Sequence, residues 1–294
     1  MKEIYTEILE LGREGGAGSK FIRMSEHYVA GAWQGSSEKL SFFSRPFNGG
    51  TMLDYGSKFG HLAPVLKSLG VGQVINVDVD DEYLRDGERF IGAATGARFV
   101  KSDDCYLELE SDSVDFVLMK EVISHINPAL LFTCFQEVAR VMKPGGELVI
   151  SDGNNLDLRE MRDELMESWC EWEHGSSKEL GSNYQAMRAR MIGKAFRDLP
   201  PDRLDYFARN TSGLHGERLI ETVRRAIEGG PFIERPHRKG QLPVHPGYGT
   251  VMERGFRARD VIGRLAEHGL QGEAVAAPGP AFIVRATKGS THTE

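Results

Sequence analysis

The 294-residue chain is poor in cysteine and lacks any long apolar run. Its three cysteines, Cys105, Cys134 and Cys170, are odd in number and form no Cys-x-x-Cys pair. This argues against a disulfide framework or a zinc site and favours a reducing environment. No stretch approaches the roughly 18 apolar residues that a membrane span needs. Residues 1–14 are acidic and amphipathic, without the apolar segment of a signal peptide. We therefore expect a cytoplasmic protein without a membrane partner.

The chain also lacks internal repeats and low-complexity tracts, and its net charge is −7. An acidic balance of this kind disfavours nucleic acid as a partner. One segment has the opposite charge balance, because residues 188–257 contain 14 Lys/Arg and 8 Asp/Glu. Local positive charge concentrates anions. This segment therefore either binds an anionic small molecule or forms a solvated helical surface.

Apolar periodicity divides the chain into a cap, a core and an insertion. Residues 1–50 read as a helical cap, and residues 51–155 and 255–294 alternate between short apolar strands and helices. Such alternation predicts an α/β core, with a seven-stranded, mostly parallel sheet covered by helices on both faces. The seven expected strands span residues 51–55, 73–79, 97–101, 113–120, 146–152, 272–277 and 281–287.

The insertion, residues 156–254, follows the fifth expected strand. It reads as mainly helical, with residues 156–197 and 214–227 as its helical parts, and we expect it to act as a substrate-binding lid. After it, Pro278-Gly279-Pro280 is typical of a turn. The last two strands are therefore expected to form an antiparallel hairpin at one edge of the sheet.

The strongest local signal lies where the first expected strand ends. Asp54 is followed by a loop that contains Gly56 and Gly60, and then a helix begins. Glycine permits positive φ angles and lets the backbone approach a ligand closely. The loop is not the dinucleotide-binding pattern, because Lys58 and His61 occupy the positions that would complete it.

Acidic residues also stand at the ends of the next three expected strands. Asp78 ends the second, Asp103 follows the third and Glu121 follows the fourth. A carboxylate at the end of the second strand can accept hydrogen bonds from the ribose hydroxyls of an adenosine group. Since ligands of open α/β sheets lie beyond the carboxyl ends of the strands, these residues predict one shared ligand site.

Five sequence blocks in this order resemble the class I, Rossmann-like methyltransferases that depend on S-adenosylmethionine (SAM). The resemblance is closest to the small-molecule branch that includes the ubiquinone/menaquinone-biosynthesis type. It rests on residues 53–60, 77–78, 102–103, 114–117 and 140–146. The resemblance implies a Rossmann-like core and SAM as the cofactor.

The resemblance also implies roles for individual residues. Asp54, Gly56 and Gly60 would surround the methionine part of SAM. Asp78 would bind the ribose, and Asp103 would accept a hydrogen bond from the adenine amino group. One departure is Lys58, which stands where the family usually has a third glycine. The full set of expected cofactor-binding residues is Asp54, Gly56, Ser57, Gly60, Asp78, Val79, Asp103, Asp104, Lys120 and Glu121.

His125 is the expected catalytic residue. It follows the fourth strand, and its imidazole titrates near neutral pH, as a general base requires. The alternative is a structural histidine whose ring bonds to backbone. Residues 152–155 resemble the magnesium ligands of the catechol-type methyltransferases, but no partner ligand follows the fourth strand, and we expect no metal.

The expected function is methyl transfer from SAM to an oxygen or nitrogen of a small, anionic metabolite, such as a sugar, a nucleotide sugar or a carboxylated natural product. Two alternatives stay open. One is a non-catalytic binding module or partner subunit of the same fold, which Lys58 supports. The other is a nucleic-acid methyltransferase, although residues 120–123 lack the expected Asn-Pro-Pro-aromatic motif. The oligomeric state is open, a homodimer included. Four residues are expected to cap the cofactor pocket: Arg23, His27, Tyr28 and Trp33.

Overall fold

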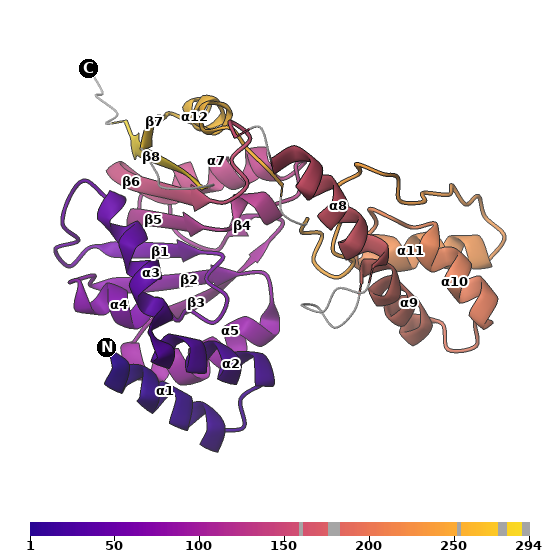
Figure 1. Ribbon diagram of the computed structural model, residues 1–294, viewed down its shortest axis with the longest axis horizontal. Helices are drawn as coiled ribbons and strands as arrows, with labels where there is room; N and C mark the ends of the chain where they lie inside the picture. The colour runs from indigo at the N-terminus through magenta and orange to yellow at the C-terminus, as the bar shows by residue number, and fades with distance from the viewer. Residues whose placement is uncertain (159–160, 176–182, 252–253, 276–280, 290–294) are drawn as a thin grey trace. The chain divides into compact units, whose positions relative to one another are not determined.

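The structure is a computed structural model, and it describes residues 1–158, 161–175, 183–251, 254–275 and 281–289. The predicted turn at Pro278-Gly279-Pro280 lies outside these residues. Contacts within the chain define two compact units (Figure 1). Unit 1 comprises Met1–Ile123, Pro128–Gly153 and Arg257–Glu294, and unit 2 comprises Ser124–Asn127 and Asn154–Phe256.

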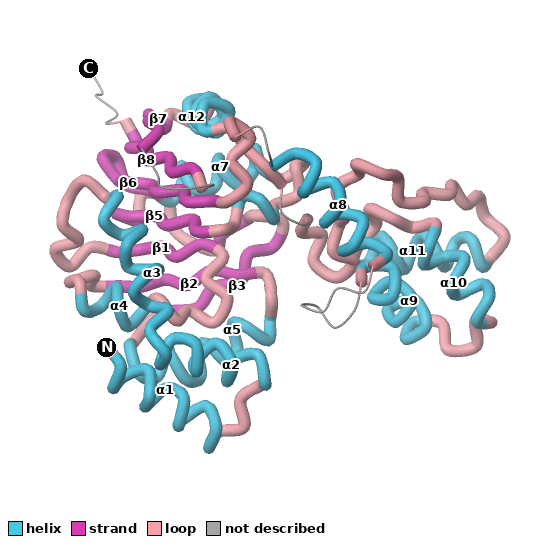
Figure 2. The backbone as a smooth tube through the Cα atoms, in the orientation of Figure 1, coloured by secondary structure: helices cyan, strands magenta, loops and turns pink. Residues whose placement is uncertain are grey.

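Unit 1 is built on one mixed sheet, in which eight strands are described (Figure 2). The spatial order is β4-β3-β2-β1-β5-β6-β8-β7. Strands β3, β2, β1, β5 and β6 run parallel, whereas β4 and the hairpin of β7 and β8 are antiparallel to their neighbours. The strands are β1 (Thr51–Tyr55), β2 (Gln73–Asp78), β3 (Arg98–Asp103), β4 (Tyr106–Leu107), β5 (Val114–Lys120), β6 (Met142–Asp152), β7 (Leu270–Val275) and β8 (Phe282–Lys288).

Helices cover both faces of this sheet. On one face, α4 and α5 contact β2, and α1 and α2 pack beside them. On the other face, α7 packs on β6 and α12 packs on β7 and β8. The helical segments of unit 1 are α1 (Lys2–Glu14), α2 (Ser19–His27), a π-helical turn η1 (Tyr28–Ala32), α3 (Trp33–Glu38), a 3-10 turn η2 (Lys39–Phe42), α4 (Ala63–Ser68), α5 (Asp81–Gly87), a π-helical turn η3 (Glu88–Gly92), α6 (Ala93–Thr95), α7 (Leu131–Val141) and α12 (Ala258–Ala266).

The predicted α/β class, the mostly parallel sheet and the hairpin at its edge are confirmed, but the described residues form eight strands rather than seven. The additional strand, β4, has two residues, too few for an alternating pattern to reveal. A second difference concerns the start of the strand that was expected at residues 146–152. Strand β6 already begins at Met142, and a register shift opposite Val114–Phe116 accommodates residues 143–145 as an irregularity in the strand.

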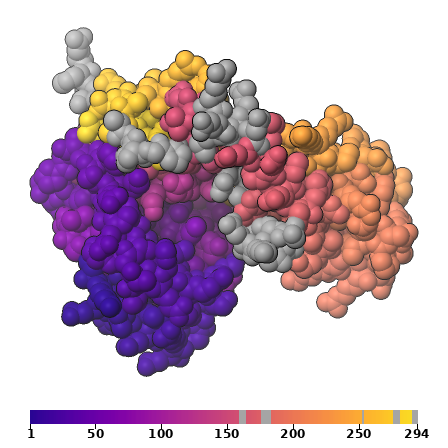
Figure 3. All heavy atoms as spheres, viewed as in Figure 1, coloured from indigo at the N-terminus to yellow at the C-terminus, as the bar shows by residue number. Residues whose placement is uncertain are grey.

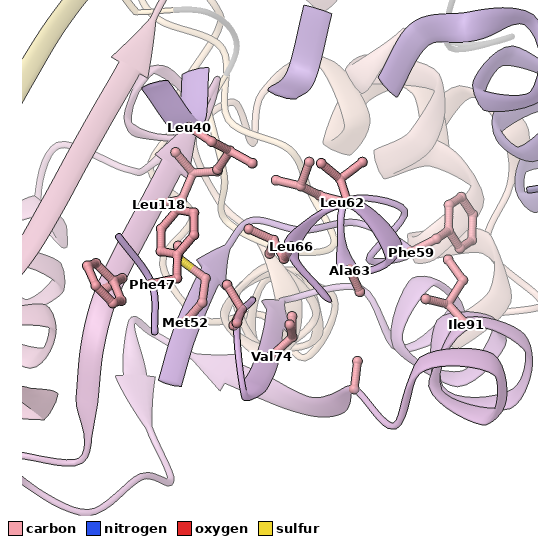
Figure 4. Packing of buried hydrophobic residues seen from close by; sticks show 14 of the residues in the cluster. Leu40, Phe47, Met52, Phe59, Leu62, Ala63, Leu66, Val74, Ile91 and Leu118 are labelled. Carbon is pink, nitrogen blue, oxygen red and sulfur yellow. The ribbon is translucent and has the colours of Figure 1, made fainter. Parts of the chain in front are cut away.

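The N-terminal helices share one apolar core with the sheet. Leu40 packs in the same cluster as Met52 of β1, Leu118 of β5 and Leu66 of α4 (Figure 4). In the space-filling view the indigo N-terminal residues form a continuous surface with the purple core of unit 1 (Figure 3). The hydroxyl of buried Tyr5 also donates to the backbone oxygen of His61 at 2.7 Å. Residues 1–43 are therefore built into unit 1.

Unit 2 is mainly helical, with a small apolar core of its own that includes Ile192, Phe207 and Leu219. Beside it, the guanidinium of Arg188 pairs with the carboxylate of Glu173, and both side chains are fully buried. No described helix of the chain is both long and apolar enough to cross a membrane. The helices of unit 2 are α8 (Met161–His174), α9 (Tyr184–Ala195), α10 (Pro201–Arg209) and α11 (Gly216–Ile227), of which α10 lies outside the predicted helical stretches.

Candidate functional site

The predicted cofactor residues gather at the carboxyl ends of the parallel strands of unit 1. β1 lies between β2 and β5, and its last residue, Tyr55, pairs with Val77 of β2 and with the penultimate residue of β5. Gly56 follows Tyr55 in the chain, as Asp78 follows Val77 on β2 and Lys120 follows Met119 on β5. The strand order reverses at β1 and β5, which is the switch point where α/β sheets bind ligands.

The glycine loop folds back onto the end of β2. The backbone N–H groups of Gly56 and Ser57 both donate to the carbonyl oxygen of Val77, at 2.7 and 2.9 Å. Gly56 has a φ of +75°, and a Cβ atom there would lie 2.4 Å from a methyl carbon of Val122. Glycine is therefore required at this position. Gly60, which also has a positive φ of +76°, ends the same loop before α4.

Lys58 occupies the position of the missing third glycine and keeps a glycine-like backbone. Its φ is +52°, in the left-handed region that costs a non-glycine residue about 1 kcal/mol. Its backbone N–H donates to a carboxylate oxygen of Asp78 at 2.8 Å. The loop thus docks on the end of β2 although a lysine replaces the glycine.

The carboxylate of Asp78 accepts three backbone hydrogen bonds. Oδ2 accepts from Lys58, and Oδ1 accepts from Val79 at 2.8 Å and from Asp80 at 3.1 Å. Burial raises the pKa of Asp78, and the three N–H donors oppose that rise. Because a carboxylate offers about four acceptor positions, Oδ2 retains one for a further donor such as a ribose hydroxyl. Two ribose hydroxyls bound by Asp78 alone would exceed this number.

Asp54 is buried in the core of the site. Burial raises its pKa to about 7, the positive charge of Lys120 lowers it, and the negative charge of Asp78 raises it further. A carboxyl group that titrates near neutrality at a strand end is typical of a binding site for a cation or a hydroxyl donor. Once a ligand cation lies beside it, the ionised form of Asp54 is favoured.

Lys120 connects the end of β5 to the N-terminal helices. Its ammonium donates to the hydroxyl of Ser36 on α3 at 3.1 Å, and the same hydroxyl lies 3.3 Å from the phenol oxygen of Tyr28. Burial lowers the pKa of Lys120, and the charges of Asp54 and Glu121 oppose this. Tyr28 is one of the predicted cap residues. The sequence analysis missed Ser36, because a serine within a helix has no local feature that marks a site.

The other predicted cofactor residues lie at neighbouring strand ends. Glu121 has a φ of +53°, and its side chain accepts a hydrogen bond from the backbone N–H of Gly153, which joins the ends of β5 and β6. Asp103 and Asp104 follow β3 with exposed side chains, and Asp104 also has a positive φ. Exposed carboxylates beyond β3 are available to a ligand, but nothing here assigns them to adenine, and their role stays a prediction.

His125 belongs to unit 2. Its ring Nδ1 lies 3.1 Å from the backbone oxygen of Val251, whose own N–H donates to the backbone oxygen of His125 at 2.6 Å. Because a carbonyl oxygen only accepts, Nδ1 carries the proton. In the neutral ring, Nε2 is then the basic nitrogen. This bond matches the structural alternative, and it leaves the nitrogen that a general base would use.

A metal site would need several His, Cys, Asp or Glu side chains close together. Among the described residues, no three His, Cys, Asp or Glu side chains gather closely enough to hold a metal ion. Asp152, the first residue of the magnesium-like segment, is buried at the end of β6 and accepts the backbone N–H of Val122 at 3.0 Å. That bond ties the segment after β5 to the end of β6.

Residues 53–150 match a protein family described as a methyltransferase domain. A relative from Synechocystis sp., a 2-methyl-6-phytyl-1,4-hydroquinone methyltransferase, is 27% identical over 113 residues. The match covers 38% of this chain and 35% of the relative, so the chain spans about a third of the length of the curated relative that it matches.

Two solved structures to which the chain is similar share little sequence with it. The PH0226 protein from Pyrococcus horikoshii OT3 is 16% identical, with a TM-score of 0.49, and the match covers 88% of this chain and 92% of that protein. A SAM-dependent methyltransferase from Mesorhizobium loti is 14% identical, with a TM-score of 0.48 and coverage of 88% and 99%.

The family match covers β1 to β6 almost completely and therefore contains the glycine loop, Asp78 and Lys120. These residues meet at the switch point of a mostly parallel α/β sheet, as the five sequence blocks predict. Residues 53–150 are thus similar to a methyltransferase domain, as the resemblance to the class I, SAM-dependent methyltransferases implies.

Proposed function

We propose that the protein transfers the methyl group of SAM to an oxygen or nitrogen of a small, anionic metabolite, such as a sugar, a nucleotide sugar or a carboxylated natural product. The observation that carries the proposal is the convergence of the glycine loop, Asp54 and Asp78 at the end of β1 and β2. This convergence supplies a backbone surface for the cofactor, a carboxyl group beside its amino-acid half and an acceptor for its ribose.

The residues of this chain would act mainly by binding and alignment. SAM, when bound, supplies a methyl group already activated on a positively charged sulfur. Asp78 would accept a ribose hydroxyl through its remaining position on Oδ2, and Asp54 would face the cationic half of the cofactor. The glycine loop would hold the cofactor close to the sheet. Nε2 of His125 would accept the proton of a hydroxyl acceptor, and an amine acceptor would not need it.

Unit 2 supplies the proposed acceptor site. The basic segment 188–257 lies in this unit except for its last residue, Arg257. Not all of its arginines can meet a ligand, because Arg188 is buried against Glu173. Arg224 is exposed and pairs with Glu221 on the same helix, where water and salt weaken the interaction. Exposed arginines such as this one, rather than Arg188, would attract an anionic acceptor.

The experiment is methyl transfer from isotope-labelled SAM to a panel of acceptors. The panel holds nucleotide sugars, carboxylated phenols, amines and, because of the Synechocystis relative, hydroquinones. We expect transfer to an anionic member, with a KM that rises as ionic strength increases. If the KM of the preferred acceptor does not change with ionic strength, this result contradicts the role of the basic segment.

The second candidate is a non-catalytic module of the same fold. Lys58 in place of the third glycine favours it. Calorimetric binding of SAM together with no transfer to any acceptor in the panel would support this candidate over the enzyme. Transfer to one acceptor would exclude it.

A further inference from the structure

The turn between β3 and β4 holds a cysteine in a conformation that favours glycine. Asp103 of β3 pairs with Tyr106 of β4, so Asp104 and Cys105 form a two-residue loop. Both have positive φ angles, +47° and +71°. Hairpin loops of this kind usually carry Asn-Gly, because a side chain in the left-handed region costs about 1 kcal/mol or more per residue. Such strain persists where the surroundings hold the residue in place.

Helix α7 binds the backbone of this hairpin. Leu107 of β4 donates its N–H to the carboxylate of Glu137 at 3.1 Å, and its backbone oxygen accepts from Arg140 at 2.9 Å. Cys134 precedes Glu137 by three residues and therefore lies on the same face of α7. This packing brings the buried thiols of Cys134 and Cys105 within hydrogen-bonding distance of each other.

The thiol pair, Cys105 and Cys134, also contacts the end of β1. The hydroxyl of Tyr55 hydrogen-bonds to the sulfur of Cys105 and lies 3.3 Å from the hydroxyl oxygen of Ser102. A hydrogen bond from the Cys134 thiol lowers the pKa of Cys105, burial raises it, and the bond from Tyr55 lowers it further. The bond to Cys105, together with burial, raises the pKa of Cys134. The pair therefore loses its first proton at Cys105, and the thiolate is the form of cysteine that reacts with disulfides.

We propose that Cys105 and Cys134 form a reversible redox site, which closes to a disulfide on reaction with a low-molecular-weight disulfide such as oxidised glutathione. The thiolate of Cys105 attacks one sulfur of the oxidant, and one glutathione thiolate leaves. Cys134 then attacks Sγ of Cys105 in the mixed disulfide and releases the second glutathione. The cysteine pair loses two electrons and two protons, and the two glutathione molecules gain them.

Oxidation also affects the cofactor site, which is the part of the inference that rests on the proposed function. Asp103 and Asp104, two of the predicted cofactor-binding residues, belong to the same turn as Cys105. A covalent bond brings two sulfurs closer together than a hydrogen bond does, so oxidation draws this turn towards α7. The oxidised protein therefore binds SAM more weakly than the reduced protein.

Disulfide mapping tests the redox site without any cofactor. The full-length protein is equilibrated with mixtures of reduced and oxidised glutathione, its remaining thiols are alkylated, and its peptides are analysed by mass spectrometry. We expect Cys105 and Cys134 to be linked while Cys170, the cysteine of unit 2, is alkylated, and dithiothreitol should restore all three thiols. Three alkylated cysteines at the most oxidising ratio, or a glutathione adduct at Cys170 alone, would overturn the proposal.

Variants separate the roles of the two thiols. Cys134→Ala removes the second attacking thiol, so the reaction should stop at a glutathione adduct on Cys105. Cys105→Gly suits the positive φ of the turn, so this variant should fold at least as well as the wild type and form no disulfide. A glutathione adduct on Cys134 in Cys105→Gly would show that Cys105 is not the attacking thiol. Cys170→Ser is the control and should form the same disulfide as the wild type.

Calorimetry then compares SAM binding by the reduced and the oxidised wild type. Oxidation should weaken binding by roughly three- to tenfold, the scale of one hydrogen bond, and Cys105→Gly should bind SAM equally under both conditions. Equal affinities of the two wild-type forms would overturn the effect on the cofactor site. If the reduced protein does not bind SAM at all, the proposed function fails, and the mapped disulfide still decides the redox site.

Discussion

Asp54 and Asp78 lie near the carboxyl ends of the adjacent strands β1 and β2, but their surroundings suit them to different parts of a ligand. Asp78 is held by three backbone N–H donors, which favour its ionised form. Asp54 is buried with Lys120 as its main opposite charge, and its pKa of about 7 leaves it close to half-protonated at neutral pH. The first residue is a fixed acceptor, and the second changes its charge in the physiological range.

This difference predicts how SAM affinity depends on pH. Binding of a cation beside Asp54 requires its ionised form, so affinity should rise with pH up to about 7 and then level off. Below pH 7 the loss approaches about tenfold for each pH unit. Lys120, Asp78 and Tyr28 are the charged or titratable groups near Asp54. Calorimetry at pH 6, 7 and 8 measures the slope, and an unchanged affinity over this range would contradict the assignment.

The same pKa predicts an effect on stability. Because the folded-state pKa of Asp54 is raised above its usual value of 3.8, the stability that its protonated form contributes is complete below pH 3.8. It is lost as pH rises through about 7. The variant Asp54→Asn, which stays neutral, should therefore unfold at higher urea concentration than the wild type at pH 8. An Asn variant that is less stable at pH 8 would show that Lys120 fully compensates the buried charge.

His125 gives a kinetic prediction. If its Nε2 deprotonates a hydroxyl acceptor, His125→Ala should lower kcat by roughly 10²–10⁴-fold. SAM affinity should stay at the wild-type value, because the cofactor residues come from unit 1. Full kcat in this variant would mean that the ring serves only its bond to Val251, or that the acceptor is an amine.

At the scale of elements, the N-terminal helices are fixed to the core by a small number of buried polar contacts. His61 directly follows the glycine loop, and its backbone oxygen accepts a hydrogen bond from the hydroxyl of Tyr5. Nε2 of its ring lies 2.8 Å from the hydroxyl oxygen of Ser25, within hydrogen-bond distance. Burial lowers the pKa of His61 to about 3, so the ring stays neutral at physiological pH. These helices also carry Ser36, which reaches Lys120.

Tyr5→Phe should therefore destabilise the protein by about 1–2 kcal/mol, because the buried backbone oxygen of His61 loses its donor. Thr6→Val is the matched control, since the exposed hydroxyl of Thr6 donates to a backbone oxygen on the same helix. That variant should stay within about 0.5 kcal/mol of the wild type. Urea unfolding compares the two, and equal midpoints would contradict the anchoring role of Tyr5.

The sequence predicted elements well where several residues repeat a pattern. The parallel core, its flanking helices and the acidic strand ends follow from such patterns. Three features escaped prediction for physical reasons. Strand β4 is two residues long, and the irregular start of β6 absorbs a proline and a glycine that normally end elements. The bond between Ser36 and Lys120 joins residues 84 positions apart, and only the packing of α3 on the sheet brings them together.

At the scale of the whole molecule, the two units are stabilised differently. Unit 1 has a large apolar core, whereas unit 2 has a small one and buries the ion pair of Arg188 and Glu173. The guanidinium also donates to the backbone oxygen of Ala208 at 2.8 Å, so α8, α9 and α10 depend on it. A buried charge without its partner is costly, so unit 2 depends on this one contact.

Arg188→Met should accordingly destabilise unit 2 by about 3–5 kcal/mol. Arg224→Met, which breaks an exposed pair in the same unit, should cost less than about 1 kcal/mol. Hydrogen exchange of α8 and α9 reports the effect, and SAM affinity in unit 1 should not change. Slow exchange that persists in Arg188→Met would show that the apolar core alone holds unit 2.

The cofactor assignment to the ends of β1, β2 and β5 is tested most directly by calorimetric titration of SAM into the wild type and Asp78→Ala. The wild type should bind one SAM per chain, and Asp78→Ala should bind it more weakly by roughly 2–4 kcal/mol, because a ribose hydroxyl loses its acceptor. Asp81→Ala, which removes an exposed carboxylate three residues away, should match the wild type. Unchanged SAM affinity in a folded Asp78→Ala protein would contradict the account.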